Sequence, residues 1–188
     1  MKYYTIIGGV NGVGKSSFTG SLKAQSLTLG TIIDVDKITA KNDNNALIGA
    51  KIAVREIDEC LKNGYSFTQE TTLSGSKTAK TCKSAKENGY FIRLYYIGLD
   101  SEEESLKRIK NRVEKGGHNI PDDTVHNRFE NRFESLKRVL PYCDEALFFD
   151  NNNGFVQVAE YRNGELILIT QNPPQWLKQM KKNFGIFA

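Results

Sequence analysis

Residues 9–16, near the N-terminus, have the types and spacing needed to bind phosphate. They read GVNGVGKS and fit the pattern G-x-x-x-x-G-K-[ST]. Glycines let the backbone approach an anion closely, and successive backbone N–H groups then point inward around it. In such a loop the lysine reaches the β- and γ-phosphates, and the serine hydroxyl is a ligand of Mg²⁺. We therefore expect nucleotide binding by Gly9, Asn11, Gly12, Val13, Gly14, Lys15, Ser16 and Ser17.

The flanking residues favour phosphate binding over the alternative, a glycine-rich turn without a ligand. Residues 3–7 are β-branched and aromatic, which is typical of a buried strand, and residues 17–24 indicate a helix. A helix that begins at the loop adds the positive end of its dipole to the anion site. We therefore expect the loop to join a strand to a helix.

Two carboxylates, Asp34 and Asp36, follow a second short apolar strand at residues 29–33. In open α/β sheets, ligands lie beyond the carboxyl ends of the strands. One carboxylate at this place can hold Mg²⁺, and the other can accept the proton of an attacking hydroxyl. The alternative is a solvated turn, in which Asp is common. We favour a functional pair that faces the phosphate loop.

A third strand is expected at residues 65–69, after a helix over residues 44–63. It leads into the segment 70–75, which reads ETTLSG. A carboxylate followed by hydroxyls can hydrogen-bond a sugar, although such a cluster can also cap a helix. The lysine-rich helix expected at residues 76–88 has no interleaved aromatic residues, so we interpret it as a solvated surface rather than a nucleic-acid interface.

Two pairs of arginines are predicted to lie on two consecutive helices. The first helix opens with a capping box at residues 101–104 and carries Arg108 and Arg112, and the second carries Arg128 and Arg132. A Gly-Gly loop at residues 115–121 joins them, as in the lid of a small kinase, which supplies guanidinium groups to the transferring phosphoryl group. Exposed faces paired with glutamates are the alternative. His118, in the loop, is expected to donate a hydrogen bond rather than bind a metal.

The remaining elements complete an α/β fold. The longest apolar strand is expected at residues 90–99, and a fifth strand at 145–150. A hairpin with an Asn-Gly turn and a short helix follow, at residues 154–188. We predict a single kinase-like P-loop domain over residues 1–188, with a five-stranded parallel sheet flanked by helices, a helical lid at about residues 105–138 and the C-terminal hairpin.

Composition is that of an ordinary globular chain. The 188 residues are 39% hydrophobic and 26% charged, and the net charge of +4 is as compatible with a nucleotide substrate as with nucleic acid. Cys60, Cys82 and Cys143 are scattered, which suggests reduced thiols and a cytoplasmic location. We expect no membrane span and no signal peptide.

In order and in sequence, these motifs resemble the zeta-toxin-like P-loop kinases, especially the compact bacterial branch of predicted ATPases. The resemblance covers residues 3–153 and rests on the phosphate loop, Asp36, and the segments 70–75, 112–121 and 150–152. Characterised members phosphorylate the 3′-hydroxyl of the amino sugar in UDP-N-acetylglucosamine. The chain departs from the family pattern at Asp34, where many relatives carry Asn, and in its C-terminal hairpin.

The resemblance implies an ATP- and Mg²⁺-dependent kinase that acts on a nucleotide-sugar hydroxyl. The catalytic residues are then Lys15, Asp36 as base, Arg112 and Arg128. Arg108 and Asn151 bind nucleotide, and Ser16 and Asp34 lie at the metal. The residues that contact substrate are Asp36, Glu70, Thr71 and His118. ATP and a small anionic acceptor are the expected partners, an antitoxin protein is a candidate partner, and nucleic acid and membrane are not expected. The alternatives are a slow ATPase that works as a nucleotide-dependent switch, and a nucleic-acid end kinase.

Overall fold

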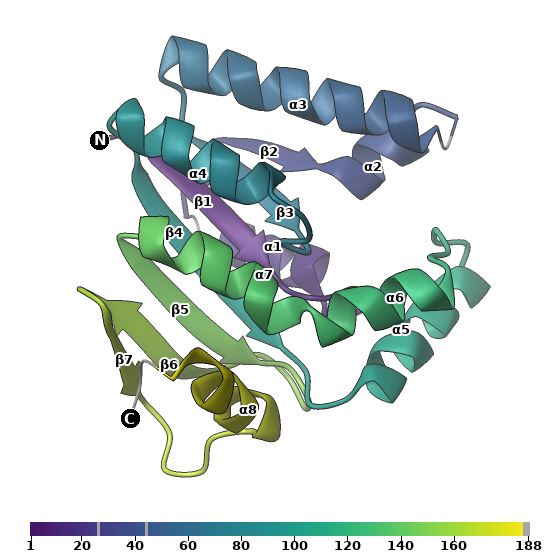
Figure 1. Cartoon of the computed structure of the whole chain (residues 1–188). Helices are drawn as coiled ribbons and strands as arrows, with labels where there is room; N and C mark the ends of the chain where they lie inside the picture. The colour runs from purple at the N-terminus through teal and green to yellow at the C-terminus, as the bar shows by residue number, and fades with distance from the viewer. Residues whose placement is uncertain (26, 44, 186–188) are drawn as a thin grey trace.

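The computed structural model contains one mixed β-sheet flanked by helices (Figure 1). It describes residues 1–25, 27–43 and 45–185. Asn44, the first residue of one predicted helix, and residues 186–188 of the predicted C-terminal segment lie outside this description. The strand order is β2-β3-β1-β4-β5-β6-β7. The strands are β1 Tyr3–Gly8, β2 Thr31–Asp34, β3 Phe67–Thr71, β4 Phe91–Gly98, β5 Glu145–Asp150, β6 Val156–Arg162 and β7 Glu165–Leu168.

The prediction of a five-stranded sheet was wrong in its count. The five expected strands form and run parallel. The C-terminal hairpin does not stand apart, because β6 pairs antiparallel with β5 and β7 with β6, which extends the sheet to seven strands in the described chain. The edge of β5 offers unpaired backbone groups, and the hairpin satisfies them.

The helices form where the sequence places caps and apolar faces. Asn45 caps the long third helix by accepting from the Ile48 amide, and Gly64 ends it with a left-handed φ of 70°. Ser101 accepts from the Glu104 amide at 3.2 Å, which confirms half of the capping box. The helices are α1 Lys15–Ala24, α2 Val35–Ala40, α3 Ala46–Asn63, α4 Lys77–Glu87, α5 Glu102–Glu114, α6 Asp122–Glu130, α7 Arg132–Val139, the 3-10 turn η1 Leu140–Tyr142 and α8 Gln175–Phe184.

The side chains of the strands point alternately to the two faces of the sheet, and an apolar cluster covers each face. On one face, Ile6, Leu94 and Phe148 pack with residues of α3, α4, α7 and α8 in the main core. On the other face, Ile7 and Ile97 pack with Phe18 and Leu22 of α1 and with other buried residues. Because both faces of the central strands are covered, their carboxyl ends are held rigidly where the phosphate loop begins.

Helices α5 and α6 project from the body as a hairpin (Figure 1). They share a small apolar cluster of their own, formed by Ile109, Ile120 and Val125. The Gly116-Gly117 pair lies in the turn at the tip of this hairpin, and the hairpin joins the body near Ser101 and Asn131. Helix α7, which the lid prediction included, packs into the main core instead. We use "lid" below for α5, α6 and their loop.

Candidate active site

The phosphate loop has the backbone shape that its glycines allow. Gly12 and Gly14 have left-handed φ values of 71° and 93°. A Cβ at Gly12 would come within 2.6 Å of the Ser105 carbonyl oxygen, and one at Gly14 within 2.8 Å of Asn151 Nδ2. Helix α1 begins directly at Lys15, so the loop joins β1 to α1 as expected. The lid and the loop after β5 therefore pack closely on the phosphate loop.

Lys15 lies in this loop and is bonded to the loop itself. Its Nζ donates to the carbonyl oxygens of Gly9 at 3.0 Å and Val10 at 2.9 Å. Burial lowers the pKa of Lys15 to about 8, although the carboxylates of Asp36, Glu70 and Asp34 counteract that shift. Burial therefore destabilises the charged ammonium group, and the negative charge of an incoming phosphate would stabilise it.

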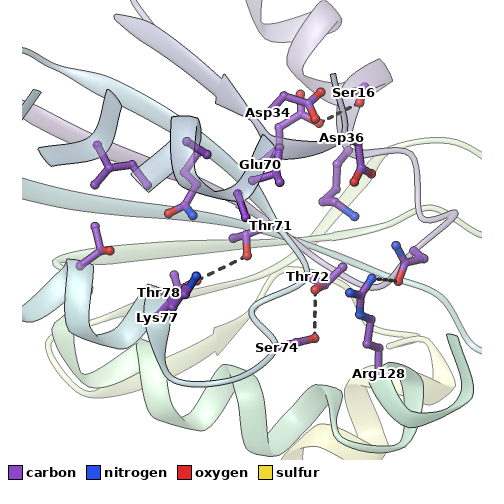
Figure 2. A pocket seen from close by; sticks show the side chains of 18 of the residues that line it. Ser16, Asp34, Asp36, Glu70, Thr71, Thr72, Ser74, Lys77, Thr78 and Arg128 are labelled. Carbon is purple, nitrogen blue, oxygen red and sulfur yellow. Dashed lines mark hydrogen bonds between the residues drawn. The ribbon is translucent and has the colours of Figure 1, made fainter. Parts of the chain in front are cut away.

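Glu70 lies beside the two hydroxyls of α1 that face the end of β3. Its Oε2 accepts from Ser16 Oγ at 2.7 Å (Figure 2), and its Oε1 accepts from Thr19 Oγ1 at 2.7 Å. The parallel register sets this contact, because Glu70 pairs with Ile7 of β1 on one side and with Asp34 of β2 on the other. The structure thus brings Glu70 to the expected metal ligand Ser16, and the sequence had no signal for the Thr19 contact.

The two aspartates at the end of β2 have different surroundings. Asp34 is buried and is the N-cap of α2: it accepts from the Lys37 amide and forms an ion pair of 3.0 Å with Lys37 Nζ. Asp36 is exposed in the first turn of α2 and lines the pocket that contains the phosphate loop. Of the carboxylates, Asp36 has the largest effect on the pKa of Lys15, which it raises against the lowering by burial. Both aspartates line the pocket, and Asp36 is the exposed one of the pair.

The segment after β3 turns sharply and directs hydroxyls into the same pocket. Leu73 is buried and takes a left-handed φ of 61°, a strained conformation for a large side chain. The turn brings Thr72 and Ser74 to the pocket wall, with their hydroxyls 2.9 Å apart (Figure 2). Thr71 also lines the pocket, but its hydroxyl already accepts from the Leu73 amide at 3.0 Å. The hydroxyl-bearing residues of the ETTLSG segment therefore gather at the pocket wall.

Three of the predicted arginines, Arg108, Arg112 and Arg128, line the pocket from the lid. Arg128 donates to Asn11 Oδ1 at 3.0 Å and points into the pocket in Figure 2. Arg108 also lines the pocket and donates to the carbonyl oxygens of Asn151 and Asn152. Arg132, to which the sequence analysis assigned no site role, instead lies over the rings of Phe129 and Phe133.

Arg112 and His118 occupy the outer part of the lid. Arg112 lines the pocket, and its Nη2 donates to the His118 carbonyl oxygen at 2.6 Å, while its Nε is buried without a partner among the described residues. The His118 side chain is exposed and is not among the residues that line the pocket. The structure therefore brings Arg112 to the site and leaves the His118 ring outside the pocket.

The pocket extends from the phosphate loop into a space between α3 and α4, with a volume of about 640 Å³. Ala53 and Ile57 form an apolar wall there, and Lys77 and Lys80 of α4 line the opposite side. The lysines of α4 are exposed, as the sequence predicted, and these two also lie at the pocket. Their position in the first turn of the helix that follows the ETTLSG segment was the signal that could have identified them.

A parallel sheet with a phosphate loop at β1, a carboxylate at the ends of β2 and β3 and an arginine-bearing lid defines a fold of the P-loop kinase class. The family model described as Zeta toxin matches residues 34–155. The chain belongs to the zeta toxin family, as its motifs had suggested. The matched range begins at Asp34, and the phosphate loop precedes it.

One sequence relative and several solved structures are similar to this chain. An uncharacterized protein of Haemophilus influenzae is 37% identical over 126 residues, which is 64% of this chain and 88% of that protein. A chain in the structure of the PezAT chromosomal toxin-antitoxin system of Streptococcus pneumoniae has a TM-score of 0.67 at 17% identity, covering 97% of this chain and 84% of its own.

A chain of the AvrRxo1-ORF1:AvrRxo1-ORF2 structure with sulphate ions has a TM-score of 0.69 at 16% identity. The match covers 96% of this chain but spans only 63% of that one. A structure of the same pair with ATP has a TM-score of 0.67 at 18% identity. At these identities the likeness shows the fold. Among the described residues, no helix is long and apolar enough to cross a membrane.

Proposed function

We propose that this protein transfers the γ-phosphoryl group of ATP to a hydroxyl of a small anionic acceptor, with UDP-N-acetylglucosamine as the first candidate. The observation that carries the proposal is one continuous pocket: the phosphate loop and Asp36 lie at one part of it, and an acceptor-sized space between α3 and α4 adjoins them. Membership of the zeta toxin family supports the reaction class. Lys77 and Lys80 support an acceptor that carries negative charge.

The residues at the phosphate loop fit Mg²⁺ and ATP. Ser16 Oγ and Glu70 Oε2 lie 2.7 Å apart and are both oxygen ligands of the type that Mg²⁺ prefers, so Ser16 would bind the ion and Glu70 would hold it directly or through water. When bound, the ion neutralises charge on the β- and γ-phosphates. Asp34 is engaged by Lys37, which leaves it a supporting part at the edge of this metal site.

In the transfer step the acceptor hydroxyl attacks the γ-phosphorus while its proton passes to the Asp36 carboxylate. The bond from phosphorus to the β,γ-bridging oxygen breaks, and ADP leaves with that oxygen. Lys15 and the guanidinium groups of Arg112 and Arg128 stabilise the charge on the transferring group. Thr72 and Ser74, beside Glu70 and Thr71, provide hydroxyls for the acceptor. We further propose a cytoplasmic location and an antitoxin protein as the partner of this family member.

Asp36→Asn tests the proposal because it is nearly isosteric and cannot accept the proton. Phosphorylation of UDP-N-acetylglucosamine, followed with labelled ATP, should fall about 10²- to 10⁴-fold, which is typical for loss of a general base. The affinity for MgADP should change little, because the phosphate loop is intact. Asp123→Asn is a matched control, since Asp123 is exposed on α6 and is not among the residues that line the pocket.

Three other outcomes would count against parts of the proposal. If Asp36→Asn retains activity and Asp34→Asn loses it, the two aspartates have opposite roles. If wild-type protein phosphorylates nucleosides or RNA ends but no nucleotide sugar, the acceptor is wrong. If the protein only hydrolyses ATP slowly and phosphorylates none of the acceptors tested, it is a nucleotide-dependent switch and not a kinase.

A further inference from the structure

Trp176, the single tryptophan of the chain, joins the C-terminal helix to the carboxyl ends of two strands. Its side chain is 1% exposed and lies flat against Gly98 at the end of β4, where a Cβ would come within 2.3 Å of the ring. Its backbone amide donates to Asp100 Oδ1 at 2.8 Å, and its indole Nε1 donates to Asp150 Oδ1 at 2.9 Å. Trp176 therefore holds two carboxylates that follow different strands.

Asn152 closes the connection between the same two carboxylates. Its Nδ2 donates to Asp150 Oδ1 at 2.7 Å and to Asp100 Oδ2 at 3.0 Å. Its Oδ1 accepts from the Asp100 amide at 3.2 Å. The four residues Trp176, Asp100, Asp150 and Asn152, called the tryptophan network below, thus fix the backbone after β5 to the point at which the chain enters the lid.

The tryptophan network leads directly to the phosphate loop. Asn151, between two of its members, donates from Nδ2 to the Val13 carbonyl oxygen at 2.8 Å. The carbonyl oxygens of Asn151 and Asn152 accept from Arg108 Nη2 at 2.8 and 3.2 Å, and Arg108 lines the pocket. The place of residues 150–152 therefore determines where the loop carbonyl and the Arg108 guanidinium lie.

We propose that Trp176 is a positioning residue for nucleotide binding, acting through Asp150 and Asn152 on the phosphate loop and Arg108. If Trp176 served only to attach α8 to the body, the apolar contacts of Leu177, Met180 and Phe184 with the main core would be sufficient. The indole N–H and the backbone amide of Trp176 instead orient carboxylates next to the nucleotide-binding residues. The inference rests on the proposed function in that it assumes that the loop binds nucleotide.

The test compares MgADP affinity in Trp176→Phe and in Leu177→Val by titration calorimetry. Trp176→Phe retains an aromatic ring but loses the indole donor, whereas Leu177→Val loses a buried methylene on the same helix and leaves the tryptophan network intact. Trp176→Phe should weaken MgADP binding roughly five- to tenfold, the equivalent of one lost hydrogen bond. Leu177→Val should stay within about twofold of wild type at a similar loss of melting temperature. Equal affinities of the two variants for MgADP would overturn the proposal.

A second pair of variants keeps the test decisive if Trp176→Phe does not fold. Asn152→Ala breaks the connection between the two carboxylates, and Asn153→Ala is its control on the neighbouring exposed residue. Asn152→Ala should weaken MgADP binding roughly five- to tenfold and reduce the change in Trp176 fluorescence on MgADP addition; Asn153→Ala should do neither. If wild-type protein binds MgADP and Asn152→Ala binds it equally well, this inference alone fails. If wild-type protein does not bind MgADP, the proposed function fails with it.

Discussion

At the scale of single residues, Lys15 determines how the site responds to pH. Burial lowers its pKa to about 8, so the ammonium group of the free protein loses its proton above that pH. The phosphates of a bound nucleotide favour the charged form and raise the pKa, so binding above pH 8 requires the uptake of a proton. The nucleotide affinity is therefore coupled to pH through this one side chain.

The affinity for MgADP should be constant below pH 8 and should fall by up to about tenfold per pH unit above it. Calorimetric titrations between pH 6.5 and pH 9.5, in buffers of different ionisation enthalpy, measure both the affinity and the proton uptake. Lys15→Arg is the control, because a guanidinium stays charged over this whole range. If wild type and Lys15→Arg show the same pH dependence, another group titrates.

At the scale of elements, the lid has its own small cluster of apolar residues and also contacts the phosphate loop and the loop after β5. Ser105 Oγ donates to the Asn11 carbonyl oxygen at 2.6 Å, and Arg128 donates to the Asn11 side chain. Since the Gly116-Gly117 pair forms the tip, we place the hinges of lid movement at the base, near Ser101 and Asn131. The loop at the tip instead holds Arg112 through the His118 carbonyl oxygen.

Arg112→Lys tests whether this lid arginine acts in the transition state. The variant keeps the positive charge but loses the planar fork that can hold two phosphate oxygens together. We expect kcat for acceptor phosphorylation to fall by about 10²-fold or more, with MgADP affinity within about threefold of wild type. Lys110→Arg, an exposed change on the same helix, is the control. A parallel loss of kcat and nucleotide affinity would assign Arg112 to ground-state binding or to the scaffold.

Local sequence patterns predicted the helices and strands of this fold well. They did not predict the contacts between segments that are distant in the sequence. The phosphate-loop pattern and the apolar runs predicted the strands because both depend on neighbouring residues. The contact of Glu70 with Ser16 and Thr19 depends on β3 lying beside β1, which no local pattern shows. The place of Lys77 and Lys80 at the pocket was missed for the same reason, since the pocket exists only when α3 and α4 pack together.

At the scale of the whole molecule, the described part of the C-terminal segment 154–188 is an integral part of the sheet and the core and not a separate appendage. The hairpin continues the sheet beyond β5. From α8, Trp176, Leu177, Met180 and Phe184 are all buried in the main core with residues of α4 and α7. The amphipathic spacing of these four side chains is visible in the sequence, but their partners come from other elements, such as Tyr96 of β4, which packs against Trp176, and helix α7.

Removal of residues 154–188 should therefore prevent folding of the remaining 1–153 fragment. Each fully buried large apolar side chain contributes about 1.5–3 kcal/mol, so four of them amount to about 6–12 kcal/mol, which is comparable with the whole stability of a domain. Loss of the hairpin also exposes β5 as an apolar edge that favours aggregation. Circular dichroism and a thermal melt of the purified fragment measure the outcome. A full-length variant with Ile167→Ser and Ile169→Ser, two exposed positions, is the control and should melt as wild type does. A 1–153 fragment that melts cooperatively and binds MgADP would show that the C-terminal segment is dispensable for both fold and site.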